Sequence, residues 1–378
     1  MEKIKLSKNI LNEVIDNENK CVDCKICFNS CPMMKDYSMS PKKLLKEIVD
    51  EKCVNKNIPY SCMLCNICTI KCPKDIDLNS MFYNMRKDIF KINQKSINNI
   101  GYKTVKVHQS NSFSPIFSKS FIKPNTKSIF FPGCSLSSYK NDIVLKTYEY
   151  LKCYIEDISL VFECCGKPTL SIGDLDRFNN YYSKLESKFN ENDIHEVIVA
   201  CPNCYKTIKH NSKNIKVKTI WEVITEYGIP KELNNYYKDI DKMFSLHDPC
   251  PIRDVDIIHE SVRTILNELG VKIVEFDKNR NKSECCGSGG MVRVINPQLS
   301  KKQTNKRANE AKTDNIVTYC ESCCESMLSV NKKTLHILDF MFNEDVLKYK
   351  TFTQEKSSTI KKWKNRYTGI KLANKKVK

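Results

Sequence analysis

The sequence lacks three features that would have assigned it quickly. No apolar run approaches the roughly 20 residues that span a bilayer, and the longest, such as Ile158 to Phe162, have the length of strands. Residues 1–19 mix charges into every few positions and contain no apolar signal-peptide core. No G-x-G-x-x-G follows a strand-like segment. We therefore expect a cytoplasmic protein with reduced thiols, soluble or peripheral at the inner face of a membrane.

Cysteine, by contrast, is abundant, with 21 among 378 residues. Without export, disulfides are disfavoured, and structural zinc or iron–sulfur clusters remain. The formal charge of +18 counts every cysteine as neutral. An oxidised four-iron cluster on four thiolates carries about −2, so four such clusters would remove on the order of eight charges. We expect the remaining basic excess to be a solvated surface and expect no nucleic-acid partner.

Two cysteine runs stand near the N-terminus, each with the spacing C-x2-C-x2-C-x3-C-P. They are Cys21, Cys24, Cys27 and Cys31, and then Cys62, Cys65, Cys68 and Cys72. Zinc usually takes two separated C-x2-C pairs instead. The runs resemble the bacterial dicluster ferredoxin domain, in which the fourth thiol of each run reaches the other cube. The resemblance assigns one cubane [4Fe-4S] cluster to Cys21, Cys24, Cys27 and Cys72, and a second to Cys31, Cys62, Cys65 and Cys68.

A different cysteine pattern occurs twice further along the chain. Each copy has one cysteine, then Cys-Cys-Gly, then a C-x2-C pair, which is one thiol more than a tetrahedral zinc site uses. A polynuclear iron–sulfur centre fits this count better. The thiols are Cys134, Cys164, Cys165, Cys201 and Cys204 in the first copy, and Cys250, Cys285, Cys286, Cys320 and Cys323 in the second.

Strand-like segments precede the cysteine groups of both copies. They are residues 128–131, 158–162 and 196–200, and then 243–247, 272–276 and 315–319. Because the carboxyl ends of parallel strands meet at one edge of a sheet, we expect the thiols of each copy to converge there. A pseudo-twofold between the copies would place two clusters near their junction. Gly166 and the glycines of residues 287–290 would let the backbone donate N–H bonds to sulfur.

The paired motif resembles the cysteine-rich CCG domains of heterodisulfide reductases and of the iron–sulfur subunits of glycolate oxidase, anaerobic glycerol-3-phosphate dehydrogenase and lactate-utilisation complexes. The whole arrangement is similar to the D-type subunit of heterodisulfide reductase. The resemblance implies a noncubane [4Fe-4S] cluster on the five cysteines of each copy, or zinc or nothing in one of them. It implies an α+β fold: a helical dicluster ferredoxin module (1–92), an extended linker (93–127), two pseudo-symmetric α/β CCG domains (128–242 and 243–345) and a basic tail (346–378).

One departure from the family pattern bears on the chemistry. Many relatives have histidine directly after the cysteine that corresponds to Cys250, whereas this chain has Pro251. Histidine there could supply a proton to a leaving thiolate, and proline cannot. His247 is either a substitute or a structural residue. Two further alternatives stay open: Cys324 is a second ligand beside Cys323 or a bystander, and the basic segment 360–378 is a docking segment or a disordered tail.

Together these features favour an iron–sulfur electron-transfer subunit of an anaerobic oxidoreductase complex. Since no flavin or nicotinamide fold is indicated, we expect electrons to pass between a flavin-containing dehydrogenase, or another redox subunit, and an acceptor, with a peripheral membrane or quinone-linked partner as a further option. The resemblance makes the chain an oxidoreductase subunit similar to those of heterodisulfide reductase or 2-hydroxy acid oxidases. One alternative is a catalytic disulfide reductase with the noncubane clusters as active site. The other is a zinc-binding basic module. No residue is assigned a catalytic role.

Overall fold

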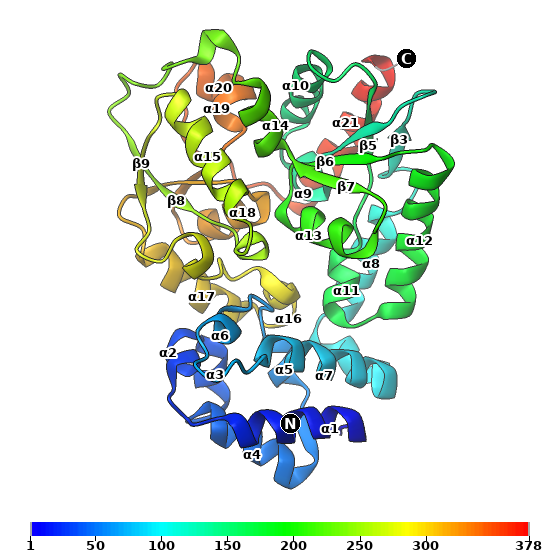
Figure 1. Cartoon of the computed structure of the whole chain (residues 1–378), viewed down its shortest axis with the longest axis vertical. Coiled ribbons are helices and arrows are strands. Elements are labelled where there is room, and N and C mark those ends of the chain that lie inside the picture. The colour runs from blue at the N-terminus through cyan, green and yellow to red at the C-terminus, as the bar shows by residue number, and fades with distance from the viewer. Residues whose placement is uncertain (1, 377–378) are drawn as a thin grey trace. The chain divides into compact units, whose positions relative to one another are not determined.

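The computed structural model describes residues 2–376, which divide into two compact units (Figure 1). Unit 1 contains the chain up to residue 109 together with residues 168–179 and 284–307. Unit 2 contains residues 110–167, residues 180–283 and the chain from residue 308 on. Among the described residues, no helix is long and apolar enough to cross a bilayer. The fold is mixed helix and sheet, as the sequence predicts.

Unit 1 is mainly helical, with one two-stranded antiparallel ribbon of β1 and β2. Its elements up to residue 100 are β1 (Lys3–Lys5), α1 (Lys8–Lys20), α2 (Ile26–Ser30), α3 (Pro32–Tyr37), α4 (Pro41–Glu51), β2 (Cys53–Asn55), α5 (Asn57–Ser61), α6 (Ile67–Ile70), α7 (Leu78–Asn93) and η1 (Gln94–Ile100). Later segments add α11 (Lys167–Ile172), η5 (Gly289–Met291), α16 (Val292–Ile295) and α17 (Pro297–Asn309), the first and last of which extend slightly beyond the unit.

The ends of the unit 1 helices follow from their sequences. The Ser40 hydroxyl accepts a bond from the Lys43 N–H at 3.1 Å, and Pro41 occupies the first turn of α4, where its missing N–H costs nothing. Asp77 caps α7 in the same way through the Ser80 N–H. The apolar side chains of α7 face inward and form part of the core. They are Leu78, Met81, Phe82, Met85 and Ile89.

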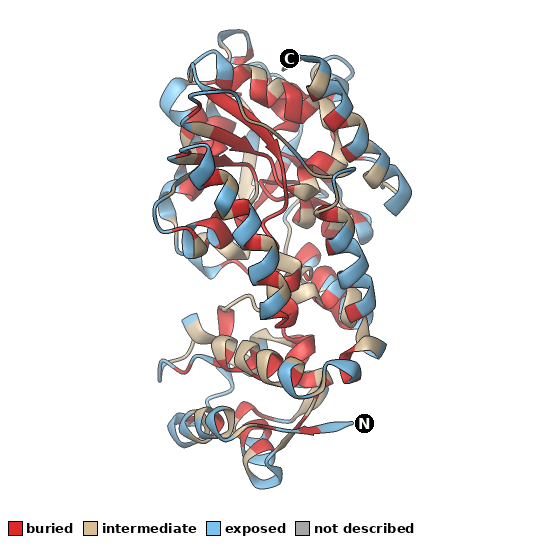
Figure 2. Cartoon of the chain, turned by 90° about the vertical axis from the view of Figure 1, so that its right-hand side faces the viewer, coloured by how far each residue is buried: buried red, intermediate tan, exposed pale blue. Residues whose placement is uncertain are grey.

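Unit 2 contains two sheets whose parallel strands have the same order. The first is β3 (Lys119–Phe121), β5 (Ile158–Phe162), β4 (Ser128–Phe131), β6 (Glu196–Val199) and β7 (Lys216–Thr219), in which only β3 is antiparallel. The second is β11 (Lys333–His336), β10 (Asn315–Thr318), β8 (Met243–His247) and β9 (Lys272–Glu275), all parallel. Figure 2 shows most of these strands buried, whereas β3, β7 and β9 are partly exposed. Numbered within each copy, both parallel sets run 2-1-3-4, which confirms the internal repeat.

Helices cover both sheets of unit 2 and connect their strands. The first copy has α9 (Cys134–Tyr139), α10 (Asn141–Lys152), α12 (Leu175–Glu191), α13 (Pro202–Asn211), α14 (Ile220–Tyr227) and η2 (Lys231–Leu233). The second has η3 (Cys250–Ile252), α15 (Asp256–Glu268), η4 (Arg280–Lys282), α18 (Glu321–Ser329), α19 (Asp339–Phe342) and α20 (Glu344–Leu347). The two copies face each other in a crossed manner, since α9 contacts α18 and α13 contacts η3. This arrangement is the expected pseudo-twofold.

One expectation about an irregular segment is wrong. The segment 93–127 is not an extended linker, because it contains η1, α8 (Tyr102–Ser112) and β3, and its Tyr102 and Val105 are buried. Of the two alternatives left open for the basic segment 360–378, the disordered tail is wrong for the described residues, because Thr359–Lys376 form α21, which packs on α9 and α10. A Cβ at Gly369 would lie 3.1 Å from the Asn141 Cβ, so glycine permits this close packing. The predicted domain boundaries themselves stay a prediction.

Candidate metal centres

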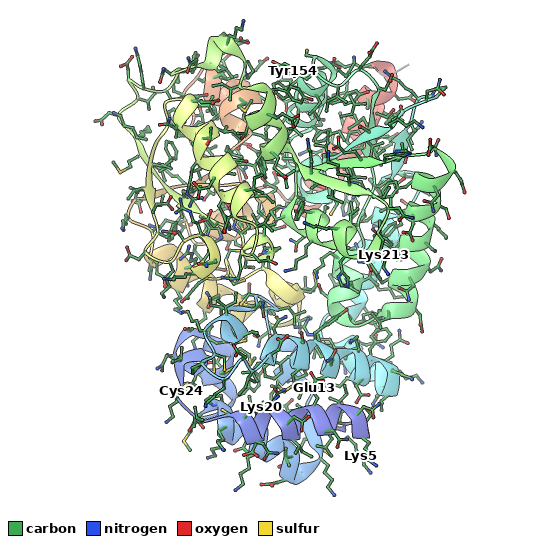
Figure 3. The ribbon with its side chains drawn as sticks, in the orientation of Figure 1. Lys5, Glu13, Lys20, Cys24, Tyr154 and Lys213 are labelled. Carbon is green, nitrogen blue, oxygen red and sulfur yellow. The ribbon has the colours of Figure 1, made fainter. Side chains whose placement is uncertain are left out.

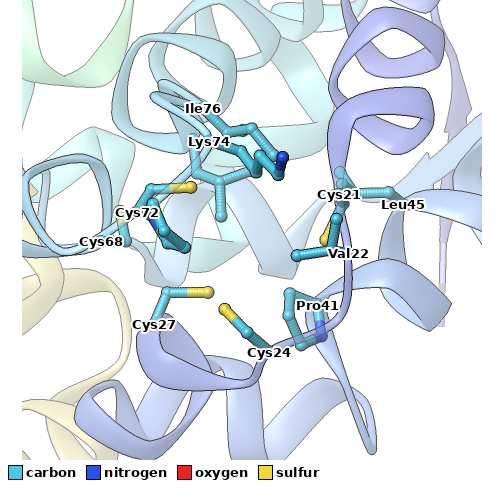
Figure 4. Close-up of a pocket in the computed structure, with 12 residues that line it drawn as sticks. Cys21, Val22, Cys24, Cys27, Pro41, Leu45, Cys68, Cys72, Lys74 and Ile76 are labelled. Atoms are coloured by element: carbon cyan, nitrogen blue, oxygen red, sulfur yellow. The ribbon is translucent and has the colours of Figure 1, made fainter.

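Five cysteines from both N-terminal runs line one pocket of unit 1, and four of them form the set expected for one cluster. Cys21, Cys24 and Cys27 come from the first run and Cys72 from the second, and Figure 4 shows the sulfurs of the last three turned toward one another. Among these thiols only Cys24 is exposed (Figure 3). The pocket therefore brings together the four cysteines that the ferredoxin resemblance assigns to one cubane cluster.

A second pocket of unit 1 holds the complementary set. Its cysteines are Cys31, Cys62, Cys65 and Cys68, and Cys285 of the second CCG motif lines the same pocket. Cys68 lines both pockets, so the two candidate cubane sites are neighbours. The thiol sets of both pockets fit four-iron clusters in number and in the exchange of the fourth ligand between the runs.

The loops that carry these thiols have the same backbone conformation in both runs. Asp23 and Lys25 have φ of 53° and 60°, and the corresponding Leu64 and Asn66 have φ of 49° and 63°. Left-handed backbone is costly for residues other than glycine, and it persists where the surroundings require it. Here it bends each loop tightly enough for three thiols to face one centre, which is the local requirement of the C-x2-C-x2-C spacing.

Burial keeps several of these thiols protonated in the absence of metal. It raises the pKa of Cys27 and of Cys62 to about 12 and that of Cys31 to about 11. Thiolates are the form that binds iron, so cluster assembly must release these protons. The free energy of metal binding must also exceed the cost of placing thiolates in a buried site, and this favours a multinuclear, thiolate-rich centre.

In the first CCG copy all five thiols lie together within unit 2. The Cys204 thiol is 3.5 Å from that of Cys165, and a hydrogen bond with Cys134 raises the pKa of Cys164. Hydrogen bonding with Cys204 lowers the pKa of Cys201. The carboxyl ends of β4, β5 and β6 bring these residues to one edge of the sheet, next to the point where the strand order reverses.

Helix N-termini add electrostatic support to the C-x2-C pairs. Cys201 is the N-cap of α13 and Cys320 is the N-cap of α18, with similar extended backbone angles. The N-terminus of a helix carries partial positive charge and favours an anion beside it. A thiolate-bound cluster is anionic, so the two copies place their C-x2-C pairs where that charge is stabilised.

The thiols of the second copy belong to both units. Cys250, Cys320 and Cys323 are in unit 2, whereas Cys285 and Cys286 are in unit 1. In unit 2, a ring nitrogen of the buried His247 lies within 4.8 Å of the Cys323 sulfur. In the second copy the loop 276–284 separates β9 from Cys285, whereas in the first copy only Glu163 separates β5 from Cys164.

Both Cys-Cys-Gly segments make the expected N–H to sulfur contact. The Gly166 N–H donates to the Cys164 sulfur at 3.5 Å, and the Gly287 N–H donates to the Cys285 sulfur at 3.3 Å. The two glycines have φ of 75° and 96°. A Cβ at Gly287 would lie 2.3 Å from the Thr304 hydroxyl, so only glycine fits this position.

Sequence reasoning missed a glutamate that precedes the cysteine pair in both copies. Glu163 is buried and pairs with Lys188, and Glu284 is buried and pairs with Lys306 at 2.6 Å. Both lysines come from long helices further along the chain, Lys188 from α12 and Lys306 from α17. The repeated letters E-C-C-G were a sufficient signal. Lys71, which precedes Cys72, adds a second cation 3.6 Å from Glu284.

Pro251 and Cys324 occupy clearly different surroundings. Pro251 lies in η3 beside Cys250 and has no ionisable side chain. The Cys324 thiol is fully buried, and burial together with the carboxylates of Glu321 and Asp339 raises its pKa. These carboxylates make Cys324 a poor site for a further thiolate.

Comparison with protein families agrees with this architecture. The 4Fe-4S dicluster domain matches residues 20–77, and the cysteine-rich CCG domain matches residues 128–209 and 244–328. The chain belongs to the iron–sulfur proteins that join a dicluster domain to two CCG domains.

The relatives are iron–sulfur proteins and subunits of redox enzymes. An uncharacterized iron–sulfur protein of Methanococcus maripaludis is 25% identical over 80% of this chain and 66% of its own length. One subunit of the fumarate reductase (CoM/CoB) of Methanothermobacter marburgensis is 22% identical over 80% of this chain and 66% of its own length. The D-type subunit of the dihydromethanophenazine:CoB–CoM heterodisulfide reductase of Methanosarcina barkeri is 21% identical over 87% of this chain and 92% of its own length. The chain thus spans about two thirds of the length of the first two.

Proposed function

We propose that this chain is an iron–sulfur electron-transfer subunit of an anaerobic oxidoreductase, with two cubane clusters and two CCG-type clusters. One observation carries the proposal. The pocket of Cys31, Cys62, Cys65 and Cys68 also contains Cys285, so the ferredoxin pair is continuous with the second CCG motif. When bound, such clusters take up and release single electrons. Cys68 lines both ferredoxin pockets, and Cys24 of the first pocket is exposed. The sites therefore form a series from the second CCG motif to a surface where a partner can dock.

The partner is proposed from what the relatives do. Their names include reductases that act on heterodisulfide or fumarate, and an EtfAB:quinone oxidoreductase of Syntrophomonas wolfei. A flavin-containing dehydrogenase on one side and a quinone-linked or thiol acceptor on the other fit this group. Val22 and Ile26, which are 57% and 43% exposed beside Cys24, provide an apolar surface for such a partner.

Metal analysis and spectroscopy of anaerobically purified protein test this function. We expect about 16 iron atoms per chain and an equal amount of acid-labile sulfide, and about 12 if one CCG site holds zinc or is empty. Replacement of Cys65 with Ala should remove the EPR signal of one reduced cubane and leave the CCG clusters assembled. The half-buried Cys53 lies outside all four thiol sets, so Cys53→Ala is the matched control. About four iron atoms with bound zinc would reject the proposal.

A second candidate function is a disulfide reductase with the CCG clusters as active site. The crossed packing of the two copies favours it, because two facing sites could receive the two sulfurs of one disulfide. Pro251 disfavours it, since the usual proton donor is missing. Reduction of a low-molecular-weight heterodisulfide by the isolated, dithionite-reduced chain would establish this function. Pro251→His should then raise turnover without changing electron transfer to a partner.

A further inference from the structure

Arg86 of α7 is a buried cation that pairs with no carboxylate among the residues that the structure describes. Its side chain is 0% exposed, and it donates to the backbone carbonyls of Pro59 at 2.8 Å, Ser171 at 2.7 Å, Gly290 at 2.7 Å and Cys62. Among the described residues, all of its hydrogen-bond acceptors are carbonyl oxygens. A buried charge without a counter-ion costs several kcal/mol, so a compensating anion is expected nearby.

The cluster ligand Cys62 is the residue through which negative charge would come close to Arg86. The Arg86 guanidinium donates to the Cys62 carbonyl, and the Cys62 side chain lines the pocket that also contains Cys31, Cys65 and Cys68. The Tyr60 ring, 5.2 Å from the guanidinium, covers another side of it. A thiolate-bound cluster on Cys62 would therefore supply the missing negative charge.

The same arginine binds two backbone segments that touch each other. A Cβ at Gly290 would lie 2.5 Å from the Cys62 carbonyl oxygen, and one at Gly289 would lie 2.2 Å from that of Met63. The glycine segment after the Cys-Cys pair is therefore in direct contact with the turn that carries the first ligand of the second run. Arg86 donates to a carbonyl on each side of this contact, Cys62 and Gly290.

We propose that Arg86 is a positioning residue that raises the reduction potential of the cluster on Cys31, Cys62, Cys65 and Cys68 and holds the glycine segment of the second CCG motif against that site. This inference rests on the proposed function, because it requires a cubane cluster there. A fixed positive charge in a low-dielectric interior stabilises the reduced form, which carries one more negative charge, and therefore raises the potential. The forked guanidinium can bridge both segments, which an ammonium group cannot do as well.

A charge series at this position, in the full-length protein purified anaerobically, tests the proposal. Arg86→Gln removes the charge, Arg86→Lys retains it, and Lys91→Met removes a charge from an exposed position of the same helix. The measurements are iron content and an EPR-monitored redox titration. We expect the cubane signal that Cys65→Ala abolishes to move to lower potential in Arg86→Gln, to move much less in Arg86→Lys, and to stay unchanged in Lys91→Met.

The remaining outcomes are also decisive. Loss of that cubane from Arg86→Gln but not from Arg86→Lys would support the proposal, since the charge would then be required for assembly. An unchanged potential in a fully loaded Arg86→Gln would overturn it, and so would equal shifts or equal cluster loss in the Gln and Lys variants. Failure of the proposed function is distinguishable, because the unaltered protein would then lack the cubane signals or the iron.

Discussion

The two CCG copies of unit 2 share a framework and differ in how they hold their cysteine loops. In both, the parallel strands run 2-1-3-4, and the fourth strand ends in the same way. The Thr219 N–H donates to Glu222 at 2.8 Å, and the His336 N–H donates to Asp339 at 2.8 Å, in each case three residues further on. The backbone framework of the repeat is therefore reproduced down to its capping contacts.

The first thiol of each copy is positioned by a different device. Gly133, with φ of 81°, brings Cys134 close to the C-x2-C pair, since a Cβ there would lie 3.2 Å from the Cys204 sulfur. The second copy has Pro249 at this position. It relies on the preceding Asp248, whose carboxylate accepts the Arg280 N–H at 2.7 Å and the Arg263 guanidinium at 2.9 Å. The first copy forms its site within one unit, whereas the second uses a longer loop that carries Cys285 to the ferredoxin ligands of unit 1.

The largest expected effect comes from removing one thiol of each Cys-Cys pair. If electrons enter through the second copy, Cys286→Ala should lower electron transfer from the ferredoxin pair to the acceptor more than about tenfold, while Cys165→Ala should lower it less. Stopped-flow oxidation of the reduced cubanes by the acceptor measures both, with iron content as a control. Equal losses in the two variants would show that the copies are equivalent in the electron path.

A second test removes the device that only the second copy has. Asp248 is buried and, against the burial that raises it, hydrogen bonds from His259 and Arg263 hold its pKa well below the usual range. Asp248→Asn should destabilise the protein by about 3 kcal/mol, because the Arg263 guanidinium loses its fully buried carboxylate partner and keeps the partly exposed Glu275. Glu275→Gln, at a side chain that is 33% exposed, should cost less than about 1 kcal/mol. Anaerobic thermal melting measures both losses of stability. Similar shifts of the melting temperature in the two variants would contradict the role given to Asp248.

The strands and thiol sets could be predicted because each leaves a local trace. Short apolar runs ahead of the cysteine groups predicted β4, β5, β6, β8, β9 and β10 to within one residue. The paired thiols of the ferredoxin runs followed from their resemblance to known domains. Each of these patterns lies within a few consecutive residues, so it can be recognised without knowing which distant residues pack against it.

The remaining features depend on contacts that the sequence does not encode locally. Arg86 has the pattern of an ordinary helical arginine, and its acceptors are carbonyls, which every residue has. The polar composition of α8 indicated a linker, and the many Lys and Arg residues of α21 left a docking segment and a disordered tail both open, yet burial of residues such as Tyr102 and Ile370 stabilises the two helices. The position of Cys285 beside the second run depends on the loop after β9, whose path has no sequence signature.

A third test compares a glycine that is held by close packing, Gly289, with one that is held by its backbone angle alone, Gly228. A Cβ at Gly289 would overlap the Met63 carbonyl oxygen, whereas one at Gly228 would meet nothing within 4 Å, although its φ is 87°. We expect Gly289→Ala to cost about 1–3 kcal/mol through overpacking and to reduce coupling between the cubane and the second CCG site. Gly228→Ala should cost about 1 kcal/mol through backbone strain alone and leave the EPR spectra unchanged. Altered EPR spectra in both variants would contradict a specific role of Gly289 in coupling the cubane to the second CCG site.

The smallest expected effect concerns His336, which corresponds to Thr219 in the first copy. Burial lowers the pKa of His336 to about 3, and its neighbours include Asp339, Tyr319 and the Trp221 ring at 5.5 Å. In the unfolded chain its pKa is about 6.5, so the folded state takes up fewer protons, and stability falls as pH drops from about 6.5 toward 3, by at most about 1.4 kcal/mol per pH unit.

Replacement of His336 with Gln removes this proton uptake from the unfolded state. The melting temperature of the variant should therefore fall less steeply than that of the unaltered protein between about pH 7 and about pH 5.5. His210→Gln, at an exposed position, is the matched control and should retain the original slope. Because the clusters themselves are sensitive to acid, only the difference between variants is informative. Parallel slopes for all three proteins would mean that His336 contributes nothing to the pH dependence and that the two copies respond alike.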